Sequence, residues 1–499
     1  MNEDQSSRHP ALAAFLSFLF PGLGQAYAGN RRLALVLAVP VLVLIILGVG
    51  LAFVDGRQAL NALLSASFLT ALIALDVALL VWRLFAIAQA GLTSQPTIAS
   101  GRPPMATPAG AVAESRTVPG ARRAGTLALV ALLLVATVGM HAWAGLIIEE
   151  LNSTLGDVFG GQHNDPNGNG TGNGGPLNRP TYSWDGTDRI NFLLLGIDSG
   201  PGRNEALTDT ILAVSVDPVS HTAVMISVPR DTAMTPLPDR SVYADGLYPR
   251  KINQLSTDAS ANPALWCPDL PVEEATSCGL RTLERTIGLY LGIEIQYYAT
   301  VDLEGFTNLI DAVGPLQLCL DGTLNDPTYQ GPGDTWLSRK RGVILQAGCH
   351  YYQGRYALAY ARARKGTLTL PDGTVQQLDD FMRADRQQQV LLELRRRFAD
   401  MDVVFKLPKA LRAIGATVHT DFARDRAGDL ASLVPLIAGP DIKRVVLGLP
   451  RFVDPPADPT VNYVLTPRRK DIRRQMRRLF GSDQLQGWYL ASNADGPPS

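Results

Sequence analysis

Two aspartates and one arginine stand where neighbouring strands are expected to end. Asp198 directly follows an apolar run that begins near Arg189, and Asp209 directly precedes a second apolar run. An antiparallel hairpin around the turn at 217–222 would place Asp209 beside Arg230, at the end away from the turn. If the first run pairs with this hairpin, Asp198 arrives at the same edge of the sheet.

Two carboxylates at one sheet edge have the chemistry of a Mg²⁺ site. Mg²⁺ is a hard cation that takes oxygen ligands and bridges phosphate oxygens. Asp198 and Asp209 are therefore the predicted metal ligands, with Arg230 beside them. Strand-end salt bridges without a metal remain the structural alternative for these three residues alone.

A helix around residue 390 brings in a further charged group. Its apolar stripe consists of Val390, Leu391, Leu394 and Phe398. At helical period the same stripe, extended backwards, takes in Asp380, Arg383 and Gln387. Because an unpaired buried charge is costly, we expect Arg383 to face an anion in a cleft. A buried ion pair between Arg383 and Asp380 is the structural alternative, and the two roles can coexist.

Two more arginines, Arg362 and Arg364, follow the apolar stretch 356–360. Their spacing puts both side chains on one side only if the backbone is extended there. An arginine fork donates two parallel hydrogen bonds and therefore suits phosphate oxygens. Taken alone, such a pair is usually a solvated surface, but with Arg230 and Arg383 it indicates a pocket for more than one phosphate.

The elements that carry these residues predict a layered α/β fold. Continuous apolar runs indicate strands that are covered on both faces. Residues 301–312 are expected to form a helix, and residues 316–320 a further strand. Helices and strands mixed in this way favour an α-β-α domain with a mixed central sheet.

Apolar segments near the N-terminus predict a membrane anchor. Residues 33–54, 60–81 and 125–148 are each long enough to cross the bilayer core as a helix. The apolar segment 11–28 is interrupted by proline and glycine, and is expected to be a short interfacial or re-entrant element. Asp76 is expected near the cytoplasmic end of its span, facing the helix bundle or snorkelling to the interface.

Basic residues set the predicted orientation. Arginines precede the first span and fill the loop 83–123, which places both on the cytoplasmic side and everything after residue 149 outside. The expected organisation is a cytoplasmic N-terminus 1–32, a membrane region 33–148, a flexible linker 149–187, a catalytic-type domain 188–480 and a tail 481–499.

The charge balance and the cysteines indicate which partners and which side of the membrane to expect. Lys+Arg is 45 and Asp+Glu is 46, which argues against nucleic acid as a partner because its binders carry a basic surplus. All four cysteines lie in the C-terminal part. Two disulfides suit an extracytoplasmic domain, and proximity favours Cys267–Cys278 and Cys319–Cys349. Buried free thiols remain the alternative.

Several separated motifs resemble the LytR–CpsA–Psr family across residues 189–435. They are Thr208–Leu212, Ser227–Thr232, Lys251–Asn253, Gly354–Arg364, and Asp380 with Arg383, Arg386 and Gln387. The resemblance implies an α/β fold with an apolar tunnel for a polyprenyl chain. It also implies a phosphotransferase of the bacterial cell membrane that moves an anionic glycopolymer from a polyprenyl-pyrophosphate carrier to peptidoglycan.

By the same resemblance, Asp198 and Asp209 would hold Mg²⁺. The residues that would bind the pyrophosphate and act in catalysis are Arg230, Arg362, Arg364, Arg383 and Gln387. The chain departs from the family at Leu207, where members often carry an arginine. Two rival functions therefore remain, a protein that binds the lipid carrier without turnover and a pyrophosphatase. A transcriptional regulator is disfavoured, because the cytoplasmic side contains no DNA-binding helix pair.

Overall fold

The chain forms two compact units, Met1–Asn152 and Ser153–Ser499, in the computed structural model. The described residues are 9–51, 56–93, 119–159, 184, 186–198, 207–239, 241–268, 275–331, 342–399, 409, 411–430, 433, 442–456, 458, 463–482 and 485–486. One helix, α6 (Pro119–Phe159), begins in the first unit and ends in the second.

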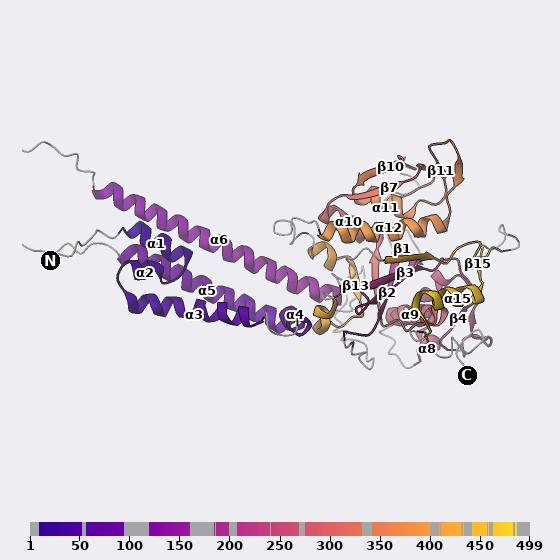
Figure 1. The fold of residues 1–499 in the computed structure, drawn as a ribbon, viewed down its shortest axis with the longest axis horizontal. Coiled ribbons are helices and arrows are strands. Elements are labelled where there is room, and N and C mark those ends of the chain that lie inside the picture. The colour runs from indigo at the N-terminus through magenta and orange to yellow at the C-terminus, as the bar shows by residue number, and fades with distance from the viewer. Residues whose placement is uncertain are drawn as a thin grey trace, which may run out of the picture. The chain divides into compact units, whose positions relative to one another are not determined.

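Three helices of the first unit are long and apolar enough to cross a membrane by length and composition. They are α3 (Arg31–Leu51), α5 (Ala66–Thr93) and α6 (Figure 1). The predicted spans 33–54 and 125–148 overlap α3 and α6. A membrane anchor built from three long apolar helices is therefore what the described part of this unit supports.

The second span lies later in the chain than the predicted 60–81. A short helix, α4 (Gly56–Leu64), precedes it, and Ser65 separates α4 from α5. The Ser65 hydroxyl accepts a hydrogen bond from the Phe68 N–H at 3.3 Å, as the N-cap residue of a helix does. The sequence stays apolar across Ser65, so its composition does not show that α4 ends and α5 begins there.

Asp76 lies inside α5, ten residues after the helix begins, and its place relative to the cytoplasmic end stays a prediction. Its Oδ1 lies 2.7 Å from Nδ1 of His141 on α6. The expectation that Asp76 faces the helix bundle is confirmed. A polar group in an apolar span needs such a partner, because lipid offers none.

The interrupted segment 11–28 forms two short helices, α1 (Pro10–Leu19) and α2 (Leu23–Tyr27). Gly22, between them, has φ 101°, a left-handed conformation that favours glycine. At about 1.5 Å per residue, α1 is too short to cross a bilayer core. The Gln25 side chain of α2 donates a 2.8 Å hydrogen bond to the Ala86 carbonyl of α5.

Helix α6 continues beyond the predicted start of the linker at 149. Its last turns carry Leu155 and Val158, which are buried, and Phe159, whose ring centroid lies 6.2 Å from that of Phe422. This apolar spacing keeps the segment helical and packed. Residues 160–183 of the predicted linker lie outside the described residues.

The second unit is built on a six-stranded sheet with the order β13-β6-β1-β2-β3-β14. Its strands are β1 (Ile190–Asp198), β2 (Leu207–Asp217), β3 (Thr222–Ser227), β6 (Tyr297–Asp302), β13 (Val418–Thr420) and β14 (Ile442–Val446). The β1–β2, β2–β3 and β13–β6 pairs are antiparallel, whereas β1–β6 and β3–β14 are parallel. The prediction of a mixed central sheet is confirmed.

Both faces of this sheet are covered by helices. Leu193 and Ile211 pack into the core on one face, against α9 (Ala275–Leu291) and α15 (Arg469–Phe480). Their neighbours along each strand pack on the opposite face, with side chains of α12 (Asp380–Ala399). Figure 1 shows the sheet between these two helical layers, and the predicted α-β-α layering is confirmed.

A further layer lies beyond α12. Helices α10 (Leu303–Val313) and α11 (Gly354–Arg362) pack with the two-stranded sheet of β7 (Leu316–Leu320) and β10 (Gly348–Tyr352). Strand β7 has the predicted bounds. The helix predicted for 301–312 begins only after Asp302, because the Asp302 carboxylate caps it by accepting the Gly305 N–H at 2.6 Å.

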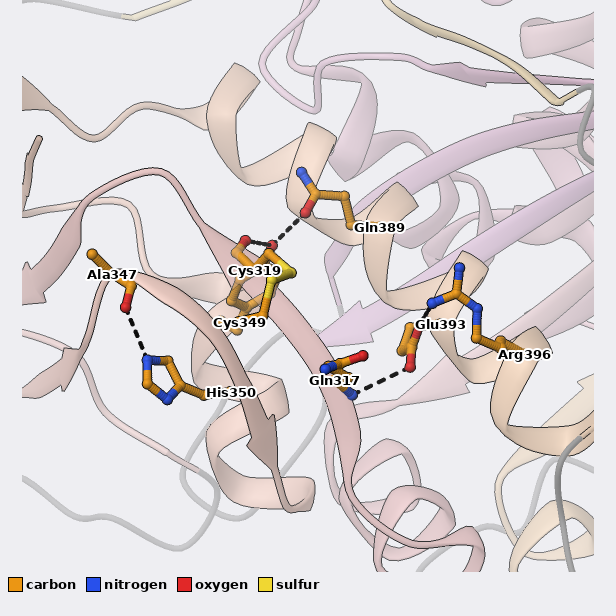
Figure 2. Close-up of a disulfide and its surroundings, with 9 residues drawn as sticks. Gln317, Cys319, Ala347, Cys349, His350, Gln389, Glu393 and Arg396 are labelled. Carbon is orange, nitrogen blue, oxygen red and sulfur yellow. Dashed lines mark hydrogen bonds and ion pairs between the residues drawn. A yellow bond between two sulfur atoms is a disulfide. The ribbon is translucent and has the colours of Figure 1, made fainter.

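The two favoured disulfides, Cys267–Cys278 and Cys319–Cys349, are both present. Cys319 and Cys349 lie directly opposite each other in the β7–β10 ladder. Figure 2 shows this disulfide beside α12, whose Gln389 amide oxygen lies 2.5 Å from the Tyr360 hydroxyl. The same hydroxyl lies 2.9 Å from the Cys319 carbonyl oxygen, so Tyr360 of α11 links the backbone at Cys319 to α12.

Replacing Cys319 and Cys349 together by alanine is expected to lower the free energy of unfolding by about 3–4 kcal/mol. The disulfide closes a 30-residue separation, and its loss enlarges the conformational freedom of the unfolded chain. Urea unfolding of the full chain in detergent measures the change. A double variant within about 1 kcal/mol of the parent would contradict the expectation.

Candidate functional site

The chemistry-bearing residues gather at one edge of the six-stranded sheet, where a β-bulge interrupts the β1–β2 ladder. Gly196 pairs with Thr210 and Ile197 with Thr208, so Asp209 is the extra residue of β2. A Cβ at Gly196 would lie only 2.7 Å from the Thr210 hydroxyl oxygen, and glycine is required there. A β-bulge re-aims side chains and leaves its extra residue without a partner in the ladder. Here that residue is Asp209.

The hairpin register matches the sequence prediction. Leu212 pairs with Ser227, and beyond this pair Asp209 lies beside Arg230. Arg230 Nη1 lies 2.6 Å from Asp209 Oδ1, with only 11% and 14% of these side chains exposed. The pair therefore lies in a largely dry setting, where charge–charge interactions are strong.

Helix α12 brings Arg383 and Asp380 into the same cluster. Arg383 is 5% exposed and donates from Nη2 to the backbone carbonyl of the bulged Asp209 at 3.1 Å. It also lies 3.0 Å from Asp380 Oδ1. Arg364 and Arg230 approach the same carboxylate at 3.3 and 3.8 Å. The expected Arg383–Asp380 ion pair is therefore present, whereas an anion facing Arg383 remains a prediction.

The second predicted metal ligand, Asp198, ends β1 next to this cluster. Arg362 Nη2 lies 2.9 Å from Asp198 Oδ2, and the charge of Arg362 also acts on Asp209. Leu207 lies directly opposite Asp198 in the β1–β2 ladder. The aliphatic Leu207 therefore lies next to the predicted metal ligand Asp198.

The end of α11 separates the two arginines that the sequence placed together. Arg362 is the last residue of the helix, and Arg364 follows the extended Ala363. Each arginine contacts a different carboxylate, Arg362 that of Asp198 and Arg364 that of Asp380. Gln387 of α12 donates to the Ala361 carbonyl at 3.3 Å, which places it beside Arg362.

Arg386 is the residue whose role the sequence did not reveal. It is 5% exposed and donates to the carbonyl oxygens of Tyr360, at 2.6 Å, and of Ala363. These carbonyls flank Arg362, so Arg386 positions the end of α11 rather than facing a ligand. Burial lowers the pKa of Arg386 to about 10. From the sequence, the apolar stripe of α12 indicates only that residues next to Arg386 are buried.

The Lys251–Asn253 motif likewise positions rather than binds. Lys251 Nζ lies 2.7 Å from Asp231 Oδ1, and the Asn253 N–H donates to the Arg230 carbonyl at 3.2 Å. Both contacts fix the loop that carries Arg230. Backbone partners of this kind follow from the fold and cannot be read from residue types alone.

Three buried guanidinium N–H groups at this edge find no hydrogen-bond acceptor among the described residues. They belong to Arg230 Nε, Arg362 Nη1 and Arg383 Nε. A buried donor without an acceptor costs free energy that an incoming acceptor recovers. That an anion with several oxygens binds at this edge remains a prediction.

The charges of the cluster keep its carboxylates ionised. Burial alone would raise the pKa of Asp209, but Arg230, Arg383 and Arg362 outweigh it, and the pKa lies below its ordinary value. The pKa of Asp380 is lowered in the same way, because Arg383, Arg230 and Arg364 outweigh its burial. Burial lowers the pKa of Arg383 to about 10, although Asp380 opposes this shift.

This pattern predicts a loss of stability in acid. A carboxylate whose pKa is lower in the folded state stabilises the fold above its unfolded pKa, which is about 3.9. The stabilisation is lost as the pH falls from there through the lowered folded pKa. Calorimetry of the full chain in detergent between about pH 5 and pH 2 measures the loss. Asp209→Asn should flatten the profile, and an unchanged profile would contradict the assignment.

The sequence profile of the LytR_cpsA_psr family matches residues 165–447, which is more than half of the chain. The chain is 31% identical over 235 residues to the Regulatory protein MsrR of Staphylococcus aureus, covering 47% of this chain and 56% of MsrR. It is 27% identical over 245 residues to the polyisoprenyl-teichoic acid–peptidoglycan teichoic acid transferase TagU of Halalkalibacterium halodurans, covering 49% and 65%. The match therefore spans less than two thirds of either relative.

Solved structures are similar at a more distant level. TagV of B. subtilis is 21% identical with a TM-score of 0.42, covering 58% of this chain and 97% of TagV. TagT bound to LIIa-WTA is 18% identical with a TM-score of 0.41, covering 62% and 96%. The profile match, and not these structural similarities, decides the family: the chain belongs to the LytR–CpsA–Psr family.

Proposed function

We propose that the chain is a membrane-anchored phosphotransferase that moves a glycopolymer from a polyprenyl-pyrophosphate carrier to peptidoglycan. The observation that carries this proposal is the set of unsatisfied N–H groups on Arg230, Arg362 and Arg383. A pyrophosphate offers several anionic oxygens in one compact group, which suits three buried donors at one edge of the sheet. The name of the TagU relatives, a transferase between polyisoprenyl-teichoic acid and peptidoglycan, supports the same substrate class.

In the proposed reaction, an acceptor hydroxyl oxygen on peptidoglycan forms a bond to the phosphorus that carries the polymer. The bridging P–O bond breaks, polyprenyl phosphate leaves, and the hydroxyl proton passes to solvent. Arg230, Arg362 and Arg383 would hold the phosphate oxygens and stabilise the charge that develops on them. Arg364 and Gln387, at the same edge, would complete the phosphate contacts.

The two carboxylates at the edge suit Mg²⁺, because this cation is commonly held by one or two carboxylates and completed by substrate phosphates. Asp198 and Asp209 each contact an arginine here. When bound to them, Mg²⁺ would supply a further positive charge next to the pyrophosphate. Asp209 is kept ionised by the surrounding arginines, as a metal ligand must be.

We propose that the second unit lies on the extracytoplasmic side of a bacterial cell membrane. Arginines at the start of the first span and in the loop 83–123 favour the cytoplasm for those segments. The two disulfides suit the oxidising side. The tunnel for the polyprenyl chain is likewise part of this proposal, since the family resemblance implies it.

A carrier-binding protein without turnover is the second candidate, and Leu207 favours it. This side chain lies opposite Asp198 and offers no charge to a phosphate. In that case, polyprenyl pyrophosphate would bind with an affinity that depends on the same arginines, while no polyprenyl phosphate would be released. Leu207→Arg would then introduce release of polyprenyl phosphate where the parent shows none.

The test is release of polyprenyl phosphate from a polyprenyl-pyrophosphate-linked saccharide by the full chain in detergent with Mg²⁺. Arg230→Ala is expected to reduce this rate by about 10²-fold, because one preorganised donor is lost. Arg250→Ala is the matched control, since Arg250 is half exposed and pairs with Asp258, which is not among the proposed site residues. Retention of the parent rate by Arg230→Ala would overturn the assignment of Arg230.

A further inference from the structure

Helix α15 (Arg469–Phe480) has two opposite faces of different character. Ile472, Met476 and Phe480 are at most 5% exposed and pack into the core against the sheet. At 100° per residue, Lys470, Arg474 and Arg478 form the opposite stripe, and all three are exposed. The helix contains six basic residues and one acidic residue.

The charge of the exposed stripe is barely neutralised within the described residues. Asp471 and Arg474 form an ion pair at 3.3 Å, but both side chains are exposed, and such pairs contribute little. Neither Lys470 nor Arg478 forms an ion pair there. The exposed Arg451 extends the patch, because it donates to Gln475 of α15 at 3.1 Å. We define the basic stripe as Lys470, Arg474 and Arg478.

The start of α15 is tied to the loop that carries Arg230. The Leu465 N–H donates to the Asp231 carbonyl, and the Ala233 N–H donates to the Leu465 carbonyl, both at 2.9 Å. Arg469 Nη2 then donates to the Met234 carbonyl at 2.6 Å. Residues 465–469 therefore connect the basic stripe with the loop that carries Arg230, within the same unit.

We propose that the basic stripe binds a polyanionic stretch of the glycopolymer while its pyrophosphate end lies at the arginine cluster. This inference rests on the proposed function and adds a second contact site for its substrate, which would bind anionic groups such as those of a repeating phosphodiester. Charge complementarity and continuity with the Arg230 loop support this occupant. An anionic bilayer is the weaker alternative, because an interfacial helix inserts its apolar face and that face is already buried here.

The experiment compares the full chain in neutral detergent with the triple variant Lys470→Gln, Arg474→Gln and Arg478→Gln. Soluble poly(glycerol phosphate) is the probe, and its affinity is measured by isothermal titration at several salt concentrations. We expect the triple variant to bind at least about tenfold more weakly at low salt, which corresponds to about 1.4 kcal/mol. The difference should shrink as salt screens the exposed charges.

The matched control is Arg355→Gln, Arg396→Gln and Lys443→Gln, which removes three exposed charges from α11, α12 and β14. It should bind the polymer as the parent does. Equal affinity of the parent and the α15 variant, or an equal loss in the control, would overturn the proposal. Loss of binding to phosphatidylglycerol vesicles with polymer binding intact would also overturn it, in favour of lipid.

A separate measurement keeps this inference distinct from the proposed function. On a polyprenyl-pyrophosphate-linked disaccharide that has no anionic polymer, the α15 variant should turn over at the parent rate. If the parent itself releases no polyprenyl phosphate, the proposed function fails. Polymer binding by the basic stripe is then still decided by the titration alone.

Discussion

Replacing Arg383 by alanine is expected to reduce turnover of a lipid-linked pyrophosphate on the order of 10³-fold, the largest effect of any single substitution at the site. Arg383 is 5% exposed and holds the Asp209 carbonyl and the Asp380 carboxylate at once. Its Nε finds no acceptor among the described residues and would donate to a phosphate oxygen. The alanine variant loses this donor together with the positive charge behind it.

Stability and chemistry must be separated in this experiment. Removing one partner of a buried ion pair destabilises a protein by about 3–5 kcal/mol, because the other charge is left uncompensated. Arg383→Lys retains a charge near Asp380 but loses the planar fork. We expect Arg383→Lys to recover most of the thermal stability and little of the turnover. An alanine variant that is folded and within a few-fold of the parent rate would contradict this role.

Replacing Arg386 by methionine is expected to destabilise the second unit by about 3 kcal/mol and to reduce turnover although Arg386 faces no ligand. Its guanidinium donates hydrogen bonds to the carbonyl oxygens of Tyr360 and Ala363 at the end of α11. Without it, these acceptors lose a charged donor, and the segment that carries Arg362 and Arg364 loses its anchor. Calorimetry and the release assay measure the two effects.

The control for Arg386 lies on the same helix. Arg396→Met removes a side chain that is 63% exposed and pairs with Glu393 across one turn. It should change the free energy of unfolding by less than about 0.5 kcal/mol and leave turnover at the parent level. If Arg386→Met behaved like Arg396→Met, the end of α11 would not depend on Arg386.

Local patterns were sufficient to predict the sheet edge. A turn at 217–222 and two apolar runs fix a hairpin register, and that register places Asp209 beside Arg230. The amphipathic stripe of α12 similarly identified Arg383 as buried, because helical period alone decides which residues share a face. Proximity along the chain was enough for both disulfides.

Long-range and backbone features could not be predicted in this way. The bulge at Asp209 depends on the close approach of Gly196 and Thr210 across two strands. The partners of Arg386 are backbone carbonyls. Every residue has one, so residue types do not show which carbonyls Arg386 contacts. The second long apolar helix begins at Ala66, where the Ser65 hydroxyl caps it within a stretch of nearly uniform apolarity, rather than at the predicted residue 60.

A structure of the full chain with a polyprenyl-pyrophosphate analogue tests the central claim most directly. The account predicts that phosphate oxygens lie within hydrogen-bond distance of Arg230 Nε, Arg362 Nη1 and Arg383 Nε, the three donors without acceptors among the described residues. An analogue whose pyrophosphate lies away from this edge, with the three donors still unmatched, would contradict it.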